Sequence, residues 1–398
     1  MKSLPSLFLI SILLLIGCGT DDNDVVLNEE EPKSKLISAT KMADISVSEL
    51  EQSFDLVFSS SEVASLKNNL VTVSAYKIIY QTPHPYFPNV QIDASGLVLL
   101  PDYDNPLPFL SLQHGTIVDT NEVPSSLVAS SVSKHYLSVL AGLKYIVVAP
   151  DYIGYGESNN LLHPYEHGHT LAQSSYNMLE AVKDFLDDQT IEVDDKLFLA
   201  GYSEGGYATM ALHKYIEDNT NTTVTASIVG GGAYNKTLFA KEIVHKNEAL
   251  DFMPNYLWVL YTYNNLYGIN EPFSFYIQQD QLANINLSNF FDSDNINTNP
   301  QELFTENFRN LILNEGQHPM IDAIKDNDRF DWQPKSLVYI LHGESDDFVF
   351  PSNATTAYEA MKTGGVSNIN LLLKDGQNHA DTALEFAIQV PIIFEELR

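Results

Sequence analysis

The chain has 398 residues, enough for one large α/β domain with an insertion or for two ordinary domains. Hydrophobic residues make up 44% of it and charged residues 18%, which excludes a disordered chain and indicates a sizeable core. Its 52 acidic residues outnumber its 21 Lys and Arg residues. The net charge of −31 argues against nucleic acid as a partner, because such binding needs basic residues that neutralise phosphates.

The first residues have the features of an export signal. Lys2 supplies a positive charge, and residues 7–16 form an apolar run of the length of a signal-peptide core. The run is too short to span a membrane comfortably. It ends in Leu-Ile-Gly-Cys at 15–18, which resembles the lipobox of bacterial lipoproteins, in which the cysteine is lipidated and becomes the mature N-terminus. This resemblance implies a signal peptide over residues 1–17, a lipid anchor at Cys18 and a location on a membrane of the bacterial cell envelope.

Cys18 is the only cysteine of the chain, so no intramolecular disulfide can form. A single reactive thiol outside the cytosol would be unusual, and lipidation explains it. The alternative is a plain cleaved signal, or a membrane anchor, with an incidental cysteine. The polar residues 18–40 are predicted to form a flexible tether. Its acidic residues resemble a surface-export signal of bacterial lipoproteins, which would expose the protein on the outer membrane, and a solvated linker explains them equally well.

From residue 71 onward, strand-like and helix-like segments alternate. Residues 71–80 and 90–100 are rich in β-branched and aromatic residues, with prolines between them, and predict a hairpin of antiparallel strands. Helices are predicted at 171–186 and 205–216. Apolar runs that predict buried strands occur at 109–112, 145–149, 196–200, 224–229, 337–341 and 369–373. Strands that alternate with helices predict a mostly parallel central sheet with helices on both faces.

The stretch 234–333 interrupts this alternation. It is rich first in aromatic residues and then in asparagine. We predict that it is an insertion within a single domain that extends over residues 41–398. Its aromatic side chains either line a substrate pocket or pack the insertion against the sheet, and packing is the commoner role of such residues.

Residues 201–205, Gly-Tyr-Ser-Glu-Gly, match the G-x-S-x-G motif of a nucleophile elbow. A predicted buried strand ends at Ala200 and a predicted helix begins near Gly205, which is the strand–turn–helix context that the motif requires. In such an elbow the serine occupies a strained turn, and side chains in place of the glycines would collide with neighbouring backbone. We therefore predict that Ser203 is a nucleophile.

A serine hydroxyl needs a base that removes its proton, and the base must be oriented by an acid. In the usual chain order of this motif, the acid and then the histidine follow the serine. Asp346 and Asp347 follow the predicted strand at 337–341, and His379 follows the next strand and is the only histidine beyond them. We predict that His379 is the base, and on this reasoning alone either aspartate can be the acid.

Several segments together resemble the secretory-lipase branch of the α/β-hydrolases and its bacterial lipoprotein relatives. They are LQHGT at 112–116, PDYIGYGES at 150–158, HPY at 163–165, GYSEGG at 201–206 and the acid loop at 343–349. The likeness extends from about residue 71 to the C-terminus. It implies an α/β-hydrolase fold with 234–333 as its cap, and hydrolysis of small-molecule or lipid carboxylic esters through an acyl-enzyme on Ser203.

The resemblance also selects the acid. In the acid loop of this family, an aspartate follows a glycine by three positions and precedes a valine by three. Asp346 meets this spacing with Gly343 and Val349, whereas Asp347 does not. The predicted triad is therefore Ser203, Asp346 and His379.

The oxyanion of the reaction needs two backbone N–H donors. One is predicted at Glu204, the residue after the nucleophile, and the other in the loop after the strand that ends at Gln113. Thr116 is the preferred donor in this loop, and Gly115 is the second choice. The position of Glu204 is commonly glutamine in this branch, and a carboxylate there would disfavour an oxyanion unless it points away or is paired.

No metal and no cofactor are predicted. His163, His167 and His169 lie close together in the sequence, but no Glu/His helix motif that would complete a zinc site accompanies them.

Three alternatives remain open. A serine peptidase of the prolyl type shares the fold and triad but usually carries a large N-terminal gating domain, whereas only a short linker is predicted here. Acyl transfer shares the acyl-enzyme with hydrolysis. A non-catalytic anchored binding protein is disfavoured by the presence of Ser203, Asp346 and His379.

Overall fold

The computed structural model describes residues 34–58, 60–126, 132–287, 289–293 and 296–398. The predicted signal peptide at 1–17, the predicted lipidation site Cys18 and most of the predicted tether lie outside the described residues. In the described ranges, no helix is both long enough and apolar enough to cross a bilayer.

The sequence predicts a tether as far as residue 40, and the structure corrects its end. Strand β1 (Leu36–Ile45) pairs antiparallel with β2 (Val73–Pro83), so ordered sheet begins at Leu36. Most side chains of β1 are exposed or only half-buried, because β1 is the edge strand. An edge strand lacks the continuous apolar run that marks a buried strand, and for this reason the pattern did not indicate it.

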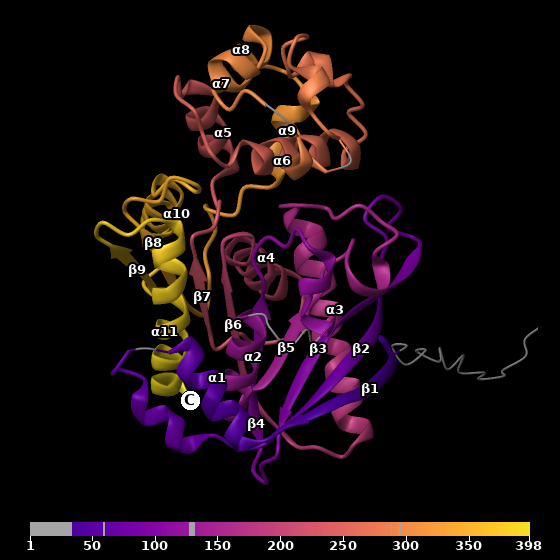
Figure 1. The fold of residues 1–398 in the computed structure, drawn as a ribbon, viewed down its shortest axis with the longest axis vertical. Helices are drawn as coiled ribbons and strands as arrows, with labels where there is room; N and C mark the ends of the chain where they lie inside the picture. The colour runs from indigo at the N-terminus through magenta and orange to yellow at the C-terminus, as the bar shows by residue number, and fades with distance from the viewer. Residues whose placement is uncertain (1–33, 59, 127–131, 288, 294–295) are drawn as a thin grey trace, which may run out of the picture. The chain divides into compact units, whose positions relative to one another are not determined.

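In the described part of the chain, nine strands form one sheet in the order β1-β2-β3-β5-β4-β6-β7-β8-β9 (Figure 1). The pairs β1–β2, β2–β3 and β3–β5 are antiparallel, and every later pair from β5–β4 to β8–β9 is parallel. The remaining bounds are β3 (Gln91–Pro101), β4 (Leu107–Gln113), β5 (Ile146–Pro150), β6 (Val193–Tyr202), β7 (Ala226–Gly230), β8 (Leu337–Gly343) and β9 (Ile369–Lys374). The predicted hairpin is formed by β2 and β3.

Helices cover both faces of the sheet (Figure 1). One face packs against α1 (Val47–Val57), α2 (Val132–Gly142) and α11 (His379–Leu397), and the other against α3 (Gly168–Asp188), α4 (Glu204–Asn219) and α10 (Ser352–Thr363). In β3, Leu97 and Leu99 belong to the first core and Val98 belongs to the second. Both faces of the central strands are therefore buried, which explains their continuous apolar runs and confirms the predicted mostly parallel, two-sided sheet.

The segment between β7 and β8 carries its own apolar core (Figure 1). Its α-helices are α5 (Lys236–His245), α6 (Met253–Leu266), α7 (Pro300–Leu303), α8 (Glu306–Leu313) and α9 (Pro319–Asp326). Aromatic side chains such as Tyr263 and Tyr276 are buried in this core, and Val349 from the loop after β8 joins it. This segment, called the cap below, leaves the sheet at the carboxyl end of β7.

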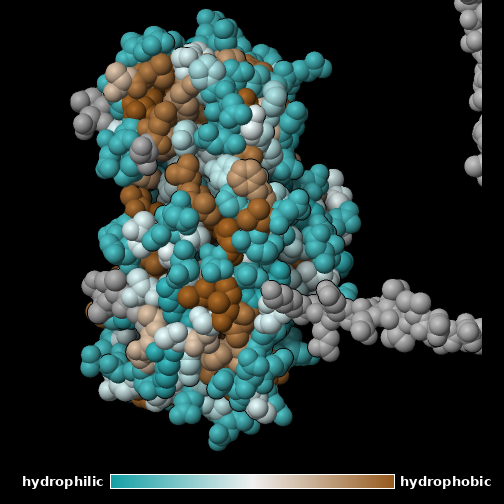
Figure 2. All heavy atoms as spheres, turned by 90° about the vertical axis from the view of Figure 1, so that its right-hand side faces the viewer, coloured by the Kyte–Doolittle hydropathy of each residue, from teal (hydrophilic) through white to brown (hydrophobic). Residues whose placement is uncertain are grey.

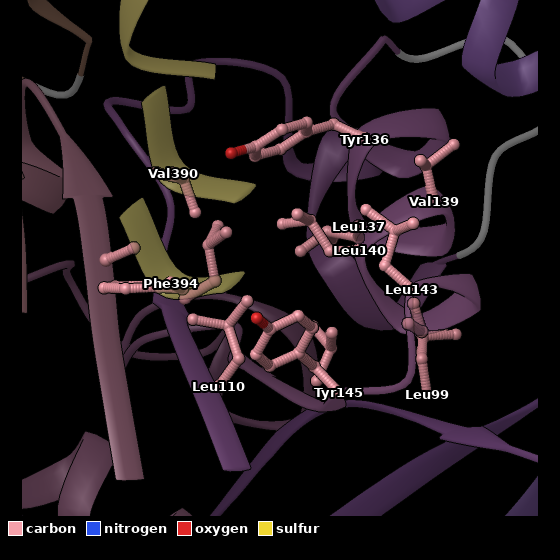
Figure 3. Packing of buried hydrophobic residues seen from close by; sticks show 14 of the residues in the cluster. Leu99, Leu110, Tyr136, Leu137, Val139, Leu140, Leu143, Tyr145, Val390 and Phe394 are labelled. Atoms are coloured by element: carbon pink, nitrogen blue, oxygen red, sulfur yellow. The ribbon is translucent and has the colours of Figure 1, made fainter. Parts of the chain in front are cut away.

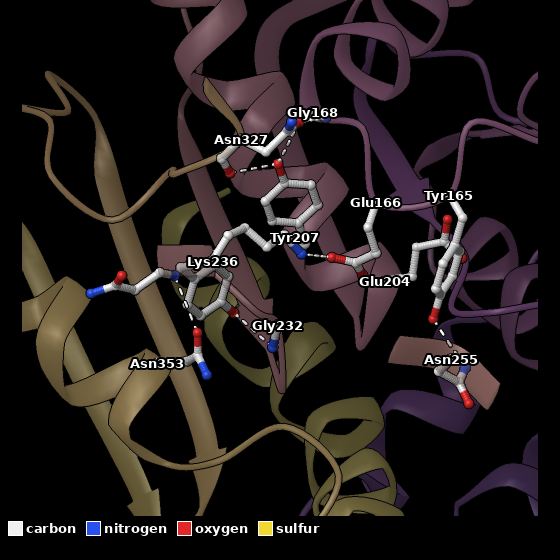
Figure 4. A network of polar contacts seen from close by, with 12 residues as sticks. Tyr165, Glu166, Gly168, Glu204, Tyr207, Gly232, Lys236, Asn255, Asn327 and Asn353 are labelled. Carbon is white, nitrogen blue, oxygen red and sulfur yellow. Dashed lines mark hydrogen bonds and ion pairs between the residues drawn. The ribbon is translucent and has the colours of Figure 1, made fainter. Parts of the chain in front are cut away.

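A buried polar network joins the cap to the sheet domain (Figure 4). Lys236, the first residue of α5, forms an ion pair with Glu166 and lies 3.8 Å from the centroid of the Tyr207 ring. Burial lowers the pKa of Lys236 well below its usual value. The hydroxyl of Tyr207 donates to the carbonyl of Asn327 at 2.7 Å, just after α9. Because a buried charge needs its partner, the network holds both ends of the cap on the core.

Phe394 of α11 tests the packing on the first face of the sheet. Its ring is fully buried, 4.6 Å between centroids from that of Phe198 in β6, and Figure 3 shows it in the core opposite the leucines of α2. Removing the ring leaves a cavity, so Phe394→Ala should lower the free energy of unfolding by about 3–5 kcal/mol. Urea unfolding followed by circular dichroism measures this loss.

The matched control is Leu384→Ala, because Leu384 lies on the same helix with 66% of its surface exposed. Its effect should stay within about 0.5 kcal/mol. Equal losses in the two variants would contradict the packing of α11 described here.

Candidate active site

Ser203 occupies the turn between β6 and α4. Its φ of 60° and ψ of −125° lie in a region that non-glycine residues rarely adopt. The N–H of Ser203 donates to the carbonyl of Gly230 at 2.9 Å, at the end of the neighbouring strand β7. The sharp turn directs the serine side chain out of the sheet at its carboxyl edge, as a nucleophile elbow requires.

Two glycines allow the elbow to pack closely. A Cβ atom on Gly205 would overlap the carbonyl oxygen of Gln113 at the end of β4, and one on Gly206 would overlap that of Gly230. The first turn of α4 therefore touches the ends of both strands that flank β6. Gly205 and Gly206 are required for this contact and not for flexibility.

The structure brings the three residues of the predicted triad together. Nε2 of His379 lies 2.9 Å from Oγ of Ser203, and Nδ1 of His379 lies 2.7 Å from Oδ2 of Asp346. They come from the ends of three parallel strands: Ser203 follows β6, Asp346 follows β8, and His379 follows β9 at the start of α11. This chain of contacts allows a proton to pass from the serine to an oriented imidazole.

The surroundings of Asp346 suit an ionised carboxylate that orients a histidine. Its side chain is fully buried, and Oδ1 accepts from the N–H groups of Phe348 and Val349 at 3.0 and 2.9 Å. Burial disfavours the charge, but hydrogen bonds from His342 and His379 outweigh it and lower the pKa of Asp346 to about 2. Asp347, by contrast, is exposed at the protein surface.

Sequence reasoning missed three side chains that hold the triad in place. Tyr202 donates its hydroxyl to the carbonyl of His379 at 2.6 Å, and its ring lies 5.0 Å from the imidazole. The ring of Phe348 packs edge-on at 4.9 Å from the same imidazole. His342 donates from Nε2 to the carbonyl of Val349 at 2.7 Å. Tyr202 and Phe348 lie in the motifs and His342 directly precedes the acid loop, but only their contacts across the fold reveal these roles.

The loop that carries Thr116 packs against the elbow. A Cβ atom at Gly115 would lie 3.6 Å from that of Ser203, and Oγ1 of Thr116 lies 2.8 Å from the hydroxyl of Tyr165. The N–H of Glu204 belongs to the first turn of α4, whose N–H groups have no partner within the helix. Glu204 thus follows Ser203 directly, and the loop that carries Thr116 contacts Ser203 through Gly115.

Three tyrosines form hydrogen bonds with this loop, and the sequence did not indicate these contacts. The hydroxyl of Tyr152 donates to the carbonyl of His114 at 3.1 Å, and that of Tyr155 donates to the carbonyl of Ile117 at 2.6 Å. Tyr165 contacts the loop through Thr116 and also accepts from Asn255 of cap helix α6 at 3.1 Å (Figure 4). The segments around 150–158 and 163–165 therefore support the loop from three points.

The side chain of Glu204 is buried and paired. Its Oε1 lies 2.7 Å from Nε2 of His163, and both side chains are almost completely buried. His167 instead caps α3 through Thr170, so the three clustered histidines do not converge on one point. Among the described residues, no group of three or more His, Cys, Asp or Glu side chains is placed to hold a metal ion.

Comparison with known proteins shows to which family the chain belongs. Residues 121–388 match the model of the secretory lipase family. The chain belongs to this family. No curated protein is similar enough in sequence to match.

Solved structures with the same fold are known from bacteria and a yeast. A putative hydrolase from Legionella pneumophila is 22% identical, with a TM-score of 0.79 over 91% of this chain and 98% of that one. The rice cell wall degrading esterase LipA from Xanthomonas oryzae is 20% identical, with a TM-score of 0.75 over 90% and 95%. Candida antarctica lipase A is 14% identical, with a TM-score of 0.59 over 87% and 78%.

These likenesses confirm the α/β-hydrolase fold and the predicted resemblance to secretory lipases. Family membership makes the protein a hydrolase that acts on esters. It also agrees with export of the chain from the cytoplasm.

The two neighbouring aspartates provide a test of the site. Asp346→Asn should lower ester turnover on the order of ten-thousand-fold, because the amide cannot hold His379 in the required tautomer or stabilise its imidazolium form. Asp347→Asn should stay within a few-fold of wild type, because that side chain points to solvent. Steady-state kinetics measures both variants, and thermal melting checks that both are folded. An inactive Asp347→Asn variant together with an active Asp346→Asn variant would show that Asp346 is not the acid of the triad.

Proposed function

We propose that the protein is a serine carboxylic ester hydrolase that forms an acyl-enzyme on Ser203. The observation that supports this most is the continuous contact from Ser203 through His379 to Asp346 at a strained elbow. Each residue has the environment that its role needs: a strained turn for the nucleophile, a ring nitrogen within hydrogen-bond distance of it for the base, and a buried ionised carboxylate for the acid.

The reaction follows from these contacts. Nε2 of His379 accepts the proton of Ser203 as Oγ attacks the ester carbonyl, and the resulting imidazolium is stabilised by Asp346. The oxyanion accepts hydrogen bonds from the N–H groups of Thr116 and Glu204. The imidazolium then donates its proton to the leaving alcohol. Water, activated by the same histidine, attacks the acyl-enzyme and releases the acid.

Apolar walls near the site suit an ester with hydrophobic groups. A groove of about 610 Å³ is lined by residues 113–117, called the oxyanion loop below, and by Tyr202. A second groove of about 330 Å³ lies between the sheet domain and the cap and is lined by Trp258, Phe291 and other side chains. On the face drawn in Figure 2, apolar side chains gather where the cap meets the sheet domain. Burial of apolar substrate groups there would favour binding.

A fluorophosphonate probe tests the nucleophile. The wild-type protein should be labelled once, and Ser203→Ala should abolish both labelling and the hydrolysis of p-nitrophenyl esters of graded acyl length, since Oγ of Ser203 forms the covalent bond in this reaction. Ser345→Ala, a change at an exposed serine in the acid loop, is the control and should retain both. Undiminished labelling of Ser203→Ala would place the reactive serine elsewhere. Faster cleavage of peptides than of esters would favour the peptidase alternative.

We also propose that the protein is anchored in the bacterial cell envelope through lipid on Cys18. The support is the Leu-Ile-Gly-Cys sequence at 15–18, the apolar run before it and membership in a secretory family. Several acyl chains on one cysteine would hold a protein firmly, whereas a single chain binds a membrane only marginally.

Metabolic labelling tests the anchor. In a bacterial host, the wild-type protein should incorporate labelled palmitate and fractionate with membranes, and Cys18→Ala should do neither. A wild-type protein that is soluble and free of label would contradict the anchor without affecting the proposed reaction.

A further inference from the structure

The first turns of cap helix α6 contact two parts of the active site that lie far apart in the sequence. The helix begins at Met253, and Phe252 is the residue directly before it. Side chains three or four positions apart on a helix are neighbours on its surface. This short stretch therefore presents two adjacent faces, and each face meets a different loop of the sheet domain.

One face holds the loop that carries the acid. Phe252 stacks on Phe348, with 3.9 Å between the ring centroids and 10° between the ring planes. The hydroxyl of Tyr256 donates to the carbonyl of Phe348 at 2.7 Å. The N–H of Phe348 donates to Asp346, and its ring packs edge-on against His379 at 4.9 Å. The acid and the base of the triad thus share one neighbour, and the cap fixes both the ring and the backbone of that neighbour.

The other face holds the oxyanion loop. Nδ2 of Asn255 donates to the hydroxyl oxygen of Tyr165 at 3.1 Å (Figure 4). The indole of Trp258 stacks on the same tyrosine, with 4.2 Å between the centroids and 11° between the planes. Because the oxygen of Tyr165 accepts from Asn255, its own hydrogen is available to Oγ1 of Thr116, 2.8 Å away. A continuous chain of contacts therefore joins α6 to the side chain of Thr116.

We propose that the first two turns of α6 position the imidazole of His379 and the oxyanion loop relative to each other, so that the cap is needed for the chemical steps as well as for substrate binding. The inference rests on the proposed ester hydrolysis at Ser203. Acylation and deacylation both need the imidazole and the oxyanion donors in place at the same time. A helix that contacts both can set their separation, and a misplacement of about 1 Å can lower the rate on the order of a hundredfold.

The contacts that α6 makes are mostly hidden from water. Asn255 and Tyr256 are 7% and 9% exposed, and Tyr165 is 3% exposed. The later turns of α6 are fixed as well, because the hydroxyl of Tyr263 donates to the carbonyl of Glu166 at 2.8 Å. A buried hydrogen bond is costly to lose, since the group that remains has no water to replace its partner. The helix is therefore held along its length and can act as a rigid support.

A helix that only shaped the substrate pocket would have a different kinetic effect. Trp258 lines the groove between the cap and the sheet domain, so a change at Trp258 would alter substrate binding as well. Asn255 and Tyr256 line neither this groove nor the groove beside the oxyanion loop. Loss of their hydrogen bonds should therefore lower kcat and leave KM nearly unchanged, whereas a role in substrate binding would raise KM.

Tyr256→Phe and Asn255→Leu each remove one of these hydrogen bonds and keep a side chain of similar size. Each variant should lower kcat for p-nitrophenyl butyrate about ten- to a hundredfold, with KM within about twofold of wild type, because the imidazole or the oxyanion loop is misplaced. The loss should be the same for p-nitrophenyl acetate and p-nitrophenyl octanoate, since positioning does not depend on acyl length. A raised KM, or a loss that grows with acyl length, would show contact with the substrate instead and overturn the inference.

The double variant tests whether one helix carries both effects. If the loss of either contact lets α6 shift, the loss of the second contact adds little. The kcat of the protein with both Asn255→Leu and Tyr256→Phe should therefore lie above the value expected from multiplying the two single losses. Losses that multiply would overturn the joint positioning by α6.

The matched control removes a tyrosine hydroxyl that is bonded to the other end of α6. The hydroxyl of Tyr276 donates to Oδ1 of Asn264 at 2.7 Å, and Tyr276 is fully buried in the cap. Tyr276→Phe should keep kcat and KM within about twofold of wild type. An equal loss of kcat in this control would indicate general loosening of the cap and overturn the inference.

Thermal melting verifies that every variant is folded at the assay temperature. An active wild-type protein whose kcat is insensitive to Tyr256→Phe and Asn255→Leu would overturn this inference and leave the proposed function intact. A folded wild-type protein without ester turnover would overturn the proposed function, and the inference with it.

Discussion

The close contact of backbone at the nucleophile elbow is the constraint on which the rest of the site depends. Gly205 and Gly206 allow the first turn of α4 to touch the carbonyl ends of β4 and β7, and the hydrogen bond from Ser203 to Gly230 supports its strained backbone. Since the oxyanion loop follows β4 directly, this contact also places Gly115 beside the serine. The position of the nucleophile and the position of the loop are thus set by one packing arrangement, and a side chain at either glycine would separate them.

The chain is strongly acidic, yet three buried carboxylates near the site and at the base of the cap have basic partners. Asp346 lies within hydrogen-bond distance of His379 and close to His342, Glu204 pairs with His163, and Glu166 pairs with Lys236. A buried charge without a partner would cost several kcal/mol, so each pair is needed for the fold as well as for any role in the reaction. The surroundings of the pairs differ: Asp346 and His379 lie beside Ser203, Glu204 and His163 meet at the start of α4, and Glu166 and Lys236 join the cap to the core.

Structures with only 14 to 22% sequence identity share this architecture, so few individual residues are needed to specify it. The core of this architecture is the buried sheet. The triad residues lie in the segments that follow the carboxyl ends of its parallel strands. Such loops can change without loss of the core, because they contribute little to it. Glu204, at the start of α4, and its partner His163, from one of the loops, meet at this edge of the sheet.

The sequence by itself determined the central strands, because both faces of a buried parallel strand must be apolar and this produces a continuous run. It also determined the elbow at Ser203, because strand, glycines, serine and helix follow each other within a few residues. Chain order indicated His379, and the resemblance of the acid loop to that of the family selected Asp346 over Asp347. The sequence did not predict the edge strand β1, because its side chains are mostly exposed and form no continuous apolar run. Only the tertiary structure decided that Tyr202 and Phe348 hold His379, that three tyrosines support the oxyanion loop, and that Glu204 meets His163 from 41 residues away. Local patterns encode local backbone, whereas contacts between distant segments depend on how the loops pack, which no local spacing records.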